Sequence, residues 1–196
     1  DGIKKNKERS RDRFLNAEEL PRFFEALEEE DETIRDFFLM ALFTGARKTN
    51  VLTMRWEQID LTLCTWRIPE TKNGDPQTLP LSPEALEILK RRKKKAQNDW
   101  VFTGTGEEGH YVDPKKAWQR IVKRAKLEDA RIHDLRRTLG SWLAARGVSL
   151  PIIGKTLGHK SSQSTQVYAR LNLDPVRESL VSATSAMSAF GGKKRG

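Results

Sequence analysis

The chain has 196 residues, of which 37% are hydrophobic and 32% charged, and its formal net charge is +9. This length fits one domain with tails, and the recurring apolar positions exclude a wholly disordered chain. A single cysteine excludes an internal disulfide and favours an intracellular protein, and no apolar run is long enough to span a bilayer. The basic excess favours a polyanionic partner, most often nucleic acid.

The first segment is polar and basic. We interpret residues 1–15 as a linker from an upstream part of the protein, or as a solvated tail, because they are mostly polar and charged. Asn16 and Glu19 resemble a capping box and predict that a helix begins here. Apolar residues then recur at helical spacing and predict one buried face, formed by Leu20, Phe23, Phe24 and Leu27.

The next segments predict two helices and a hairpin. Residues 34–43 form an apolar helix that stops at Gly45, and residues 48–54 can form a short helix. Residues 65–69 and 78–81 read as two strands, and the Asn73-Gly74 pair between them is a strong turn signal. This hairpin carries Lys72 near its tip.

The second half of the sequence predicts further helices. Ser82 and Pro83 open one of them, which ends in the basic run 91–95. That run either complements the negative end of the helix or contacts phosphates. Helices are also expected from 114 onward, from His133 to Gly147, from 151 to 157, around Tyr168 and from 174 onward. The expected fold is mainly α with a small antiparallel β-sheet (α+β).

The chemistry suggested by the sequence needs no metal. There is no HExxH or Walker motif, no compact carboxylate cluster, and too few Cys and His residues for an ordinary zinc site. We therefore expect neither a metal nor a cofactor. Phosphodiester chemistry without metal requires cations that hold the phosphate, a nucleophile and a general acid.

Four motifs supply such groups in a fixed order. Thr44-Gly45-Ala46-Arg47 comes first, then residues 133–138 (HDLRRT), then Leu157-Gly158-His159, and finally Tyr168. This ordered set, with a lysine on the hairpin between the first and second motifs, resembles the tyrosine recombinase (phage integrase) family. The resemblance runs from about residue 16 to residue 170 and implies that family's catalytic-domain fold.

The resemblance implies a phosphate clamp. Arg47 and Arg136 stand at the positions of the two phosphate-binding arginines, and His159 stands where a His or Trp bonds the phosphate. The structural alternatives are ion pairs within the fold for the two arginines and a hydrogen-bonded structural role for the histidine. Many relatives carry Glu or Asp at the position of Asn50, and we expect Asn50 to keep the supporting role without the charge. We expect the adjacent Arg137 to face elsewhere.

The resemblance also implies the proton carriers and the nucleophile. Tyr168 matches the residue that forms a 3′-phosphotyrosine link, and nearby cations should favour its ionised form. Lys72 matches the general acid for the departing 5′-oxygen, and His133 matches a proton acceptor or phosphate ligand. The alternatives are a half-buried structural tyrosine and a solvated turn lysine.

From this we expect three parts: a linker (1–15) from a missing N-terminal core-binding domain, the catalytic domain (16–172) and a tail (173–196). The implied function is site-specific recombination that integrates or excises a mobile element. Alternatives are a type IB topoisomerase and a catalytically silent DNA-binding module. Expected partners are double-stranded DNA, further copies in a tetramer and an accessory DNA-bending protein, with no membrane, in a bacterial cytoplasm at nucleoid DNA.

The tail predicts an amphipathic helix. Apolar residues recur every three or four positions and form one stripe: Val176, Leu180, Ala183, Met187 and Phe190. The stripe can fold back on its own domain or dock on a neighbouring copy, and we favour docking.

Overall fold

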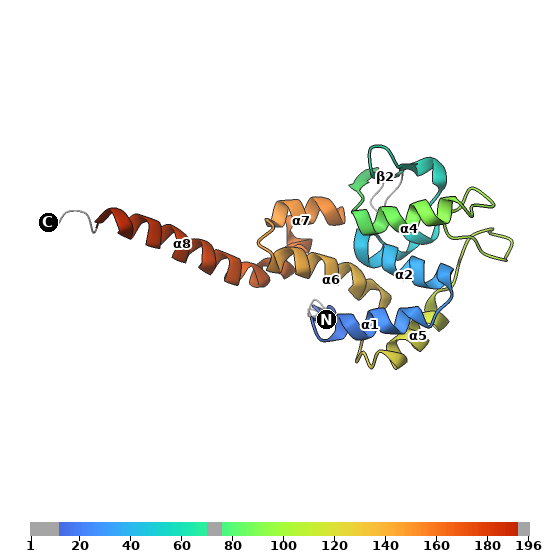
Figure 1. Cartoon of the computed structure of the whole chain (residues 1–196), viewed down its shortest axis with the longest axis horizontal. Coiled ribbons are helices and arrows are strands. Elements are labelled where there is room, and N and C mark those ends of the chain that lie inside the picture. The colour runs from blue at the N-terminus through green and yellow to red at the C-terminus, as the bar shows by residue number, and fades with distance from the viewer. Residues whose placement is uncertain (1–11, 70–75, 192–196) are drawn as a thin grey trace, which may run out of the picture.

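The computed structural model describes residues 12–69 and 76–191 (Figure 1). This part is mainly helical with one small antiparallel sheet, as the sequence predicts. The helices are α1 (Glu19–Glu28), α2 (Glu32–Thr44), α3 (Lys48–Leu52), α4 (Pro83–Lys93), α5 (Lys115–Arg124), α6 (Ile132–Ala145), α7 (Leu150–Leu157) and α8 (Leu173–Gly191). Short 3-10 helices are η1 (Trp56–Gln58), η2 (Ser162–Ser164) and η3 (Gln166–Asn172).

Capping residues set where the helices begin and end. Asn16 Oδ1 accepts the Glu19 backbone N–H at 2.9 Å, and Glu19 Oε2 accepts the Asn16 N–H at 3.1 Å, which confirms the predicted capping box. Ser82 caps α4 through its side-chain oxygen. Gly45 and Gly158 end α2 and α7 with φ values of 60° and 62°, a left-handed conformation that glycine adopts without steric cost.

The sheet has three antiparallel strands in the order β1 (Ile59–Asp60), β2 (Thr65–Ile68) and β3 (Gln77–Pro80). Trp66 of β2 pairs with Leu79 of β3, which confirms the predicted pairing of the two hairpin strands. The sequence did not predict β1, because a strand of two residues has no readable alternation. The predicted turn at Asn73-Gly74 lies outside the described residues.

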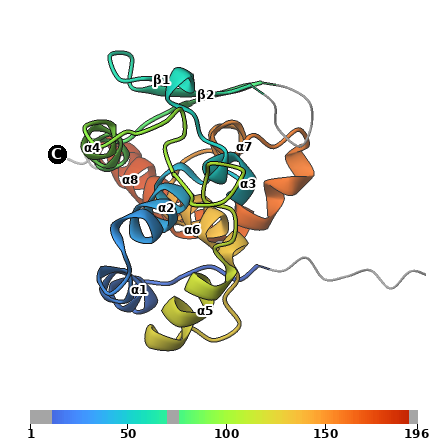
Figure 2. The same ribbon diagram turned by 90° about the vertical axis from the view of Figure 1, so that its right-hand side faces the viewer.

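The helices α2 and α6 run through the middle of the molecule. Figures 1 and 2 place α4 and the sheet on one side of them, and α1 and α5 on the other. The main core joins these layers around fully buried aromatic side chains: Phe23, Phe37, Phe38, Trp66 and Phe102. Phe24, expected on the buried face of α1, is 38% exposed and packs at the rim against Phe43, so that part of the prediction is wrong.

A second, smaller core lies between α6, α7 and η3. Its buried members are Ala144, Ile153, Leu157 and Tyr168. Tyr168, expected on an ordinary helix, lies on the 3-10 helix η3. The nucleophile candidate is therefore part of a packed cluster that joins three elements.

The helix α8 extends away from the rest of the described chain (Figure 1). Its predicted apolar stripe is exposed, from 59% for Val176 to 82% for Phe190, so it does not fold back on its own domain in this structure. Of the helices in the described residues, none has both the length and the apolar character that crossing a bilayer requires.

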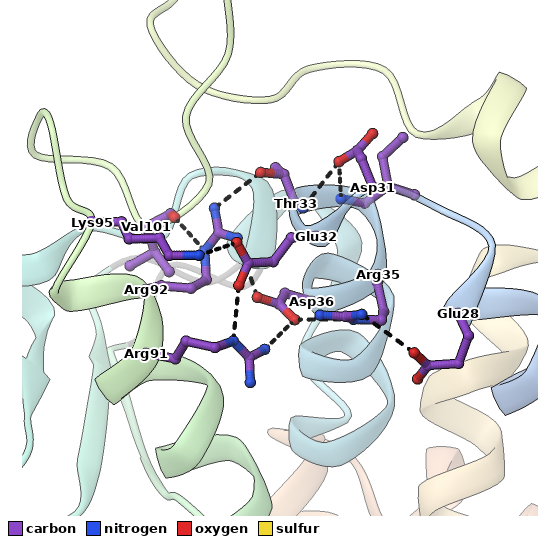
Figure 3. A network of polar contacts seen from close by, with 11 residues as sticks. Glu28, Asp31, Glu32, Thr33, Arg35, Asp36, Arg91, Arg92, Lys95 and Val101 are labelled. Carbon is purple, nitrogen blue, oxygen red and sulfur yellow. Dashed lines mark hydrogen bonds and ion pairs between the residues drawn. The ribbon is translucent and has the colours of Figure 1, made fainter.

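A buried carboxylate ties α4 to α2. Asp36 of α2 is fully buried and accepts from Arg91 Nη2 at 2.6 Å and from Arg92 Nη1 at 3.2 Å (Figure 3). Glu32, one turn earlier, accepts from Arg91 Nε at 3.0 Å and from Lys95 Nζ at 2.8 Å. Three cations of the basic run 91–95 are thus committed to acidic groups within the domain. They do not form the free phosphate-contact patch that was one interpretation of the run.

Replacing Asp36 with Ala should therefore destabilise the fold strongly. The change leaves the guanidinium of Arg92, whose side chain is only 9% exposed, without its carboxylate. Breaking one partner out of a buried ion pair costs about 3–5 kcal/mol. The free energy of unfolding in urea measures this cost. As a control, Glu28→Ala removes an exposed partner of Arg35 and should cost less than about 1 kcal/mol. Equal losses in the two variants would contradict this account of the network.

Candidate active site

Three helix ends bring the candidate residues together. Arg47 follows the left-handed Gly45 that ends α2, and it is the N-cap residue of α3. His159 follows Gly158, which ends α7 in the same way. His133 and Arg136 lie in the first turns of α6, three residues apart and hence on one face of that helix.

Arg136 connects two of these ends. It is 6% exposed, its Nη1 donates to the carbonyl oxygen of Gly45 at 2.7 Å, and its Nη2 donates to the carbonyl oxygen of Leu157. Both oxygens lie at helix C-termini, which carry partial negative charge and carbonyls without helical partners. Within the described residues no carboxylate pairs with Arg136. Burial and the nearby Arg47 lower its pKa to about 10, which still leaves it charged at neutral pH.

Five of the six predicted residues line one cavity of about 460 Å³. The lining consists of Arg47, His133, Arg136, Arg137, His159, Ser161, Gln163, Ser164, Val167 and Tyr168. Three arginines and no Asp or Glu are among these described lining residues. The cavity is therefore positively charged and suits an anion such as a phosphate group.

Arg137 was expected to face elsewhere, and that prediction is wrong. It lines the cavity while its Nη1 donates to Asp134 Oδ1 at 2.8 Å. Adjacent helix positions differ by about 100° around the axis, but the long side chain reaches around the helix to the cavity rim. The sequence alone could not predict this, because it does not show where the neighbouring elements lie.

Both histidines of the cavity favour the neutral form. Partial burial, Arg137 and Arg136 lower the pKa of His133, which lies exposed at the cavity mouth, and Asp134 opposes them. Burial, then Arg136, Arg47 and His133, lower the pKa of His159 to about 4. At neutral pH each ring therefore offers one N–H donor and one nitrogen acceptor.

Tyr168 is held against α6. It is 4% exposed, and a Cβ added to Gly140 would lie 2.5 Å from its Cζ and 2.7 Å from its hydroxyl oxygen, so the ring occupies space that only glycine leaves free. Burial raises the pKa of Tyr168, and Arg136 and Arg137 only partly oppose that rise. The neighbouring arginines thus favour the ionised form of Tyr168, as expected, but in this state desolvation outweighs them and the net shift of the pKa is upward.

The sixth predicted residue, Lys72, lies outside the described residues. The strand that follows it in the sequence is anchored beside the cavity: Gln77 Nε2 donates to the carbonyl oxygens of Lys155 and Thr156, both at 3.1 Å, near the end of α7. Gly158 makes this contact possible, because a Cβ there would lie 2.3 Å from the Gln77 side-chain oxygen.

Asn50, expected to support the site, is half-buried on α3. Its amide makes no hydrogen bond with the residues that the structure describes, so that supporting role is not seen. A residue that the sequence did not single out does support the site: Thr165 Oγ1 lies 2.9 Å from His159 Nδ1. In residues 12–69 and 76–191 no cluster of His, Cys, Asp and Glu is arranged to hold a metal ion.

Comparison with known proteins identifies the family of this chain. The profile of the Phage integrase family matches residues 13–174. The integrase of Salmonella phage P22 is 32% identical over 173 residues, which cover 81% of this chain and 44% of that protein. The prophage integrase IntF of Escherichia coli K12 is 29% identical over 174 residues, which cover 85% and 37%. The chain thus spans less than half the length of these curated relatives.

Solved structures share the fold. The catalytic domain of bacteriophage HP1 integrase matches with a TM-score of 0.67 and 20% identity, covering 85% of this chain and 92% of that one. The Tn1549 transposon integrase in complex with transposon right end DNA matches with a TM-score of 0.73 and 15% identity, covering 93% and 68%. The expected fold is therefore confirmed.

The electrostatics of the cavity predict the titration of His159. Its ring should titrate near pH 4 rather than near 6.5 in an NMR titration of the DNA-free chain, which has only three histidines. Since the folded state resists protonation, the stability that His159 contributes is present above pH 6.5 and declines as the pH falls towards 4. Replacing Arg47 with Gln should raise the midpoint, because one neighbouring cation is removed. Lys90→Gln on α4 removes the same charge elsewhere and should leave it in place. A midpoint near 6.5 in the unmodified chain would contradict the described cavity.

Proposed function

Because this chain belongs to the phage integrase family, we propose that it is the catalytic domain of a site-specific DNA recombinase that acts through a covalent bond to Tyr168. One observation carries the proposal: Arg47, Arg136, His159 and Tyr168 line one positively charged cavity without a lining carboxylate. A scissile phosphate would supply the missing negative charge. Residues 16–172 form the proposed catalytic domain, residues 1–15 the linker and residues 173–196 the tail.

The proposed reaction is a transesterification. The Tyr168 oxygen attacks the phosphorus, the bond to the 5′-oxygen breaks, and the phosphate remains as a 3′-phosphotyrosine diester. His133, neutral at the cavity mouth, is the proposed acceptor of the tyrosine proton, and Lys72 the proposed donor to the departing oxygen. Rejoining is the reverse reaction, with a 5′-hydroxyl as the nucleophile. Because one diester replaces another, the exchange needs no ATP.

Arg47 and Arg136 would hold the non-bridging oxygens of the phosphate. A guanidinium has five N–H donors, and the two backbone carbonyls occupy two of those of Arg136, so three remain for a phosphate. The side chain of Arg47 makes no hydrogen bond or ion pair with the described residues. Its whole donor set is therefore open to a ligand.

The burial of Tyr168 supports one further step. A ring that is 4% exposed beside Gly140 offers its oxygen poorly to a phosphate in a duplex. We infer that η3 shifts when DNA binds, so that the hydroxyl leaves its apolar surroundings. In the clamp its pKa would then fall, because the cations would act on it without the opposing desolvation.

The same reasoning supports partners. Double-stranded DNA is the proposed substrate, and an accessory DNA-bending protein remains a proposal from the sequence resemblance. Exchange between two duplexes breaks four strands, and each break uses one Tyr168, which favours a tetramer. The apolar stripe of α8 is exposed in the single chain. Docking on a neighbouring copy in a head-to-tail ring would bury it. A cavity of about 610 Å³ beside α7, lined partly by Leu150, Pro151 and Gly154, is the proposed acceptor.

Two alternatives were a type IB topoisomerase and a silent DNA-binding module. Three curated relatives that are 29–32% identical to this chain are named integrases or a recombinase. These names favour strand exchange over relaxation. A silent module is disfavoured because five candidate catalytic residues line one cavity: Arg47, His133, Arg136, His159 and Tyr168. As a protein that acts on DNA, it would work inside the cell.

The Tyr168→Phe variant tests the proposed chemistry. The chain is incubated with nicked DNA fragments of the organism that carries its gene, then denatured, and the covalent adducts are captured and sequenced. The unmodified chain should yield adducts enriched in one sequence and linked at Tyr168, as peptide mass spectrometry would show. Tyr168→Phe removes only the hydroxyl, so it should fold and bind DNA but form no adduct. Adducts formed by the Phe variant, or adducts on another residue, would contradict the assignment of the nucleophile.

Truncation after Asn172 tests the proposed role of the tail. The truncated chain should keep the free energy of unfolding and the DNA affinity of the full chain, because the main contacts of α8 in the described residues are with η3, next to it in the sequence, and its apolar stripe is exposed. Assembly of several protomers on DNA, measured by sedimentation, should weaken. Loss of folding on truncation would instead make the tail part of its own domain's core.

A further inference from the structure

Thr165 contacts both His159 and the turn that carries Tyr168. It is 3% exposed, its Oγ1 lies 2.9 Å from Nδ1 of His159, and its carbonyl oxygen accepts the backbone N–H of Tyr168 at 3.1 Å. One buried residue therefore contacts the ring of His159 through its side chain and the turn that carries Tyr168 through its backbone.

The surroundings fix the Thr165 hydroxyl in place. A Cβ added to Gly154 on α7 would lie 3.0 Å from Oγ1, so the hydroxyl fills the space that this glycine leaves. The other side of the contact is fixed as well, because the backbone N–H of His159 donates to the carbonyl oxygen of Gly154 at 2.9 Å. The contact between Thr165 and His159 therefore joins two segments that are both held by α7.

The direction of this hydrogen bond follows from counting donors. In the described residues, Nδ1 of His159 is the single hydrogen-bond partner of the Thr165 hydroxyl. If Nδ1 carried the proton, it would donate to Oγ1 and the buried hydroxyl proton would have no acceptor. Buried donors without acceptors are rare and costly. The satisfied arrangement has Thr165 donating to an unprotonated Nδ1.

We propose that Thr165 is a positioning residue that holds His159 in the tautomer with its proton on Nε2, so that the ring presents an N–H donor to the cavity. The choice of tautomer matters because the ring is neutral, with a pKa of about 4. Phosphate oxygens only accept hydrogen bonds, and with Nδ1 occupied by Thr165 only Nε2 is left for them. The consequence for catalysis rests on the proposed function, whereas the tautomer itself does not.

The first test is NMR of the 196-residue chain without DNA. Long-range correlations from the ring protons of ¹⁵N-labelled histidine distinguish the two nitrogens at a pH where His159 is neutral. We expect His159 to have a protonated Nε2 and an Nδ1 that accepts a slowly exchanging hydroxyl proton. That hydroxyl signal should disappear in Thr165→Val, which keeps the side-chain shape, and remain in Thr165→Ser. A protonated Nδ1 in the unmodified chain would overturn the proposal, whatever the protein does to DNA.

The second test measures covalent cleavage in a double-mutant cycle on the trapped DNA sequence. Thr165→Val should slow cleavage about 10- to 100-fold, the loss typical when a partner that orients a metal-bound histidine is removed. Thr165→Ser should restore most of the rate. In a His159→Ala background Thr165→Val should cost nothing further, because there is no ring to orient. A cost that is the same in both backgrounds, or absent in both, would show that Thr165 does not act through His159. If no variant forms adducts, the proposed function fails, while the NMR result still decides the tautomer.

Discussion

The hydrogen bonds from Arg136 to the carbonyl oxygens of Gly45 and Leu157 are the interaction on which the whole site depends. These oxygens lie at the C-terminal ends of α2 and α7. Two residues after each comes a candidate phosphate ligand, Arg47 after Gly45 and His159 after Leu157. Arg136 itself comes from a third helix, α6. One buried guanidinium thus sets the distance between the three segments and supplies part of the positive charge that they surround.

Two pairs of arginines differ in their partners. Arg91 and Arg92 contact the buried carboxylate of Asp36, and their charge is compensated within the fold. Arg47 and Arg136 line a cavity in which the described residues include no carboxylate; their neighbours there include Arg137, two neutral histidines and Tyr168. Leaving charge uncompensated in a half-buried cavity costs stability, and a bound phosphate would recover that cost. Burial lowers the pKa of His159 most, and the positive charges of Arg136 and Arg47, which a phosphate would cancel, lower it further.

The parts of the fold that follow from local chemistry could be predicted from the sequence. Caps such as Ser82 and Gly45 mark helix ends because their preferences are intrinsic to the backbone. The ordered motifs also placed five residues around one cavity. Features that depend on neighbours could not be predicted: the reach of Arg137, the pairing of Arg91 with α2, and the exposure of Phe24. The same holds for Tyr168, whose pKa is raised because a packed core surrounds a residue that the sequence places only near cations.

The free energy of unfolding of the Arg136→Lys variant tests the central claim most directly. Lysine keeps the charge but lacks the planar fork, so it can reach only one of the two carbonyl oxygens at a time. A hydrogen bond to a charged group contributes about 1.5–3 kcal/mol, and the carbonyl left without a partner is buried. We therefore predict a loss of about 2 kcal/mol in urea unfolding, together with shifted NMR signals of His159. A variant as stable as the unmodified chain, with His159 unchanged, would show that Arg136 does not hold the site together.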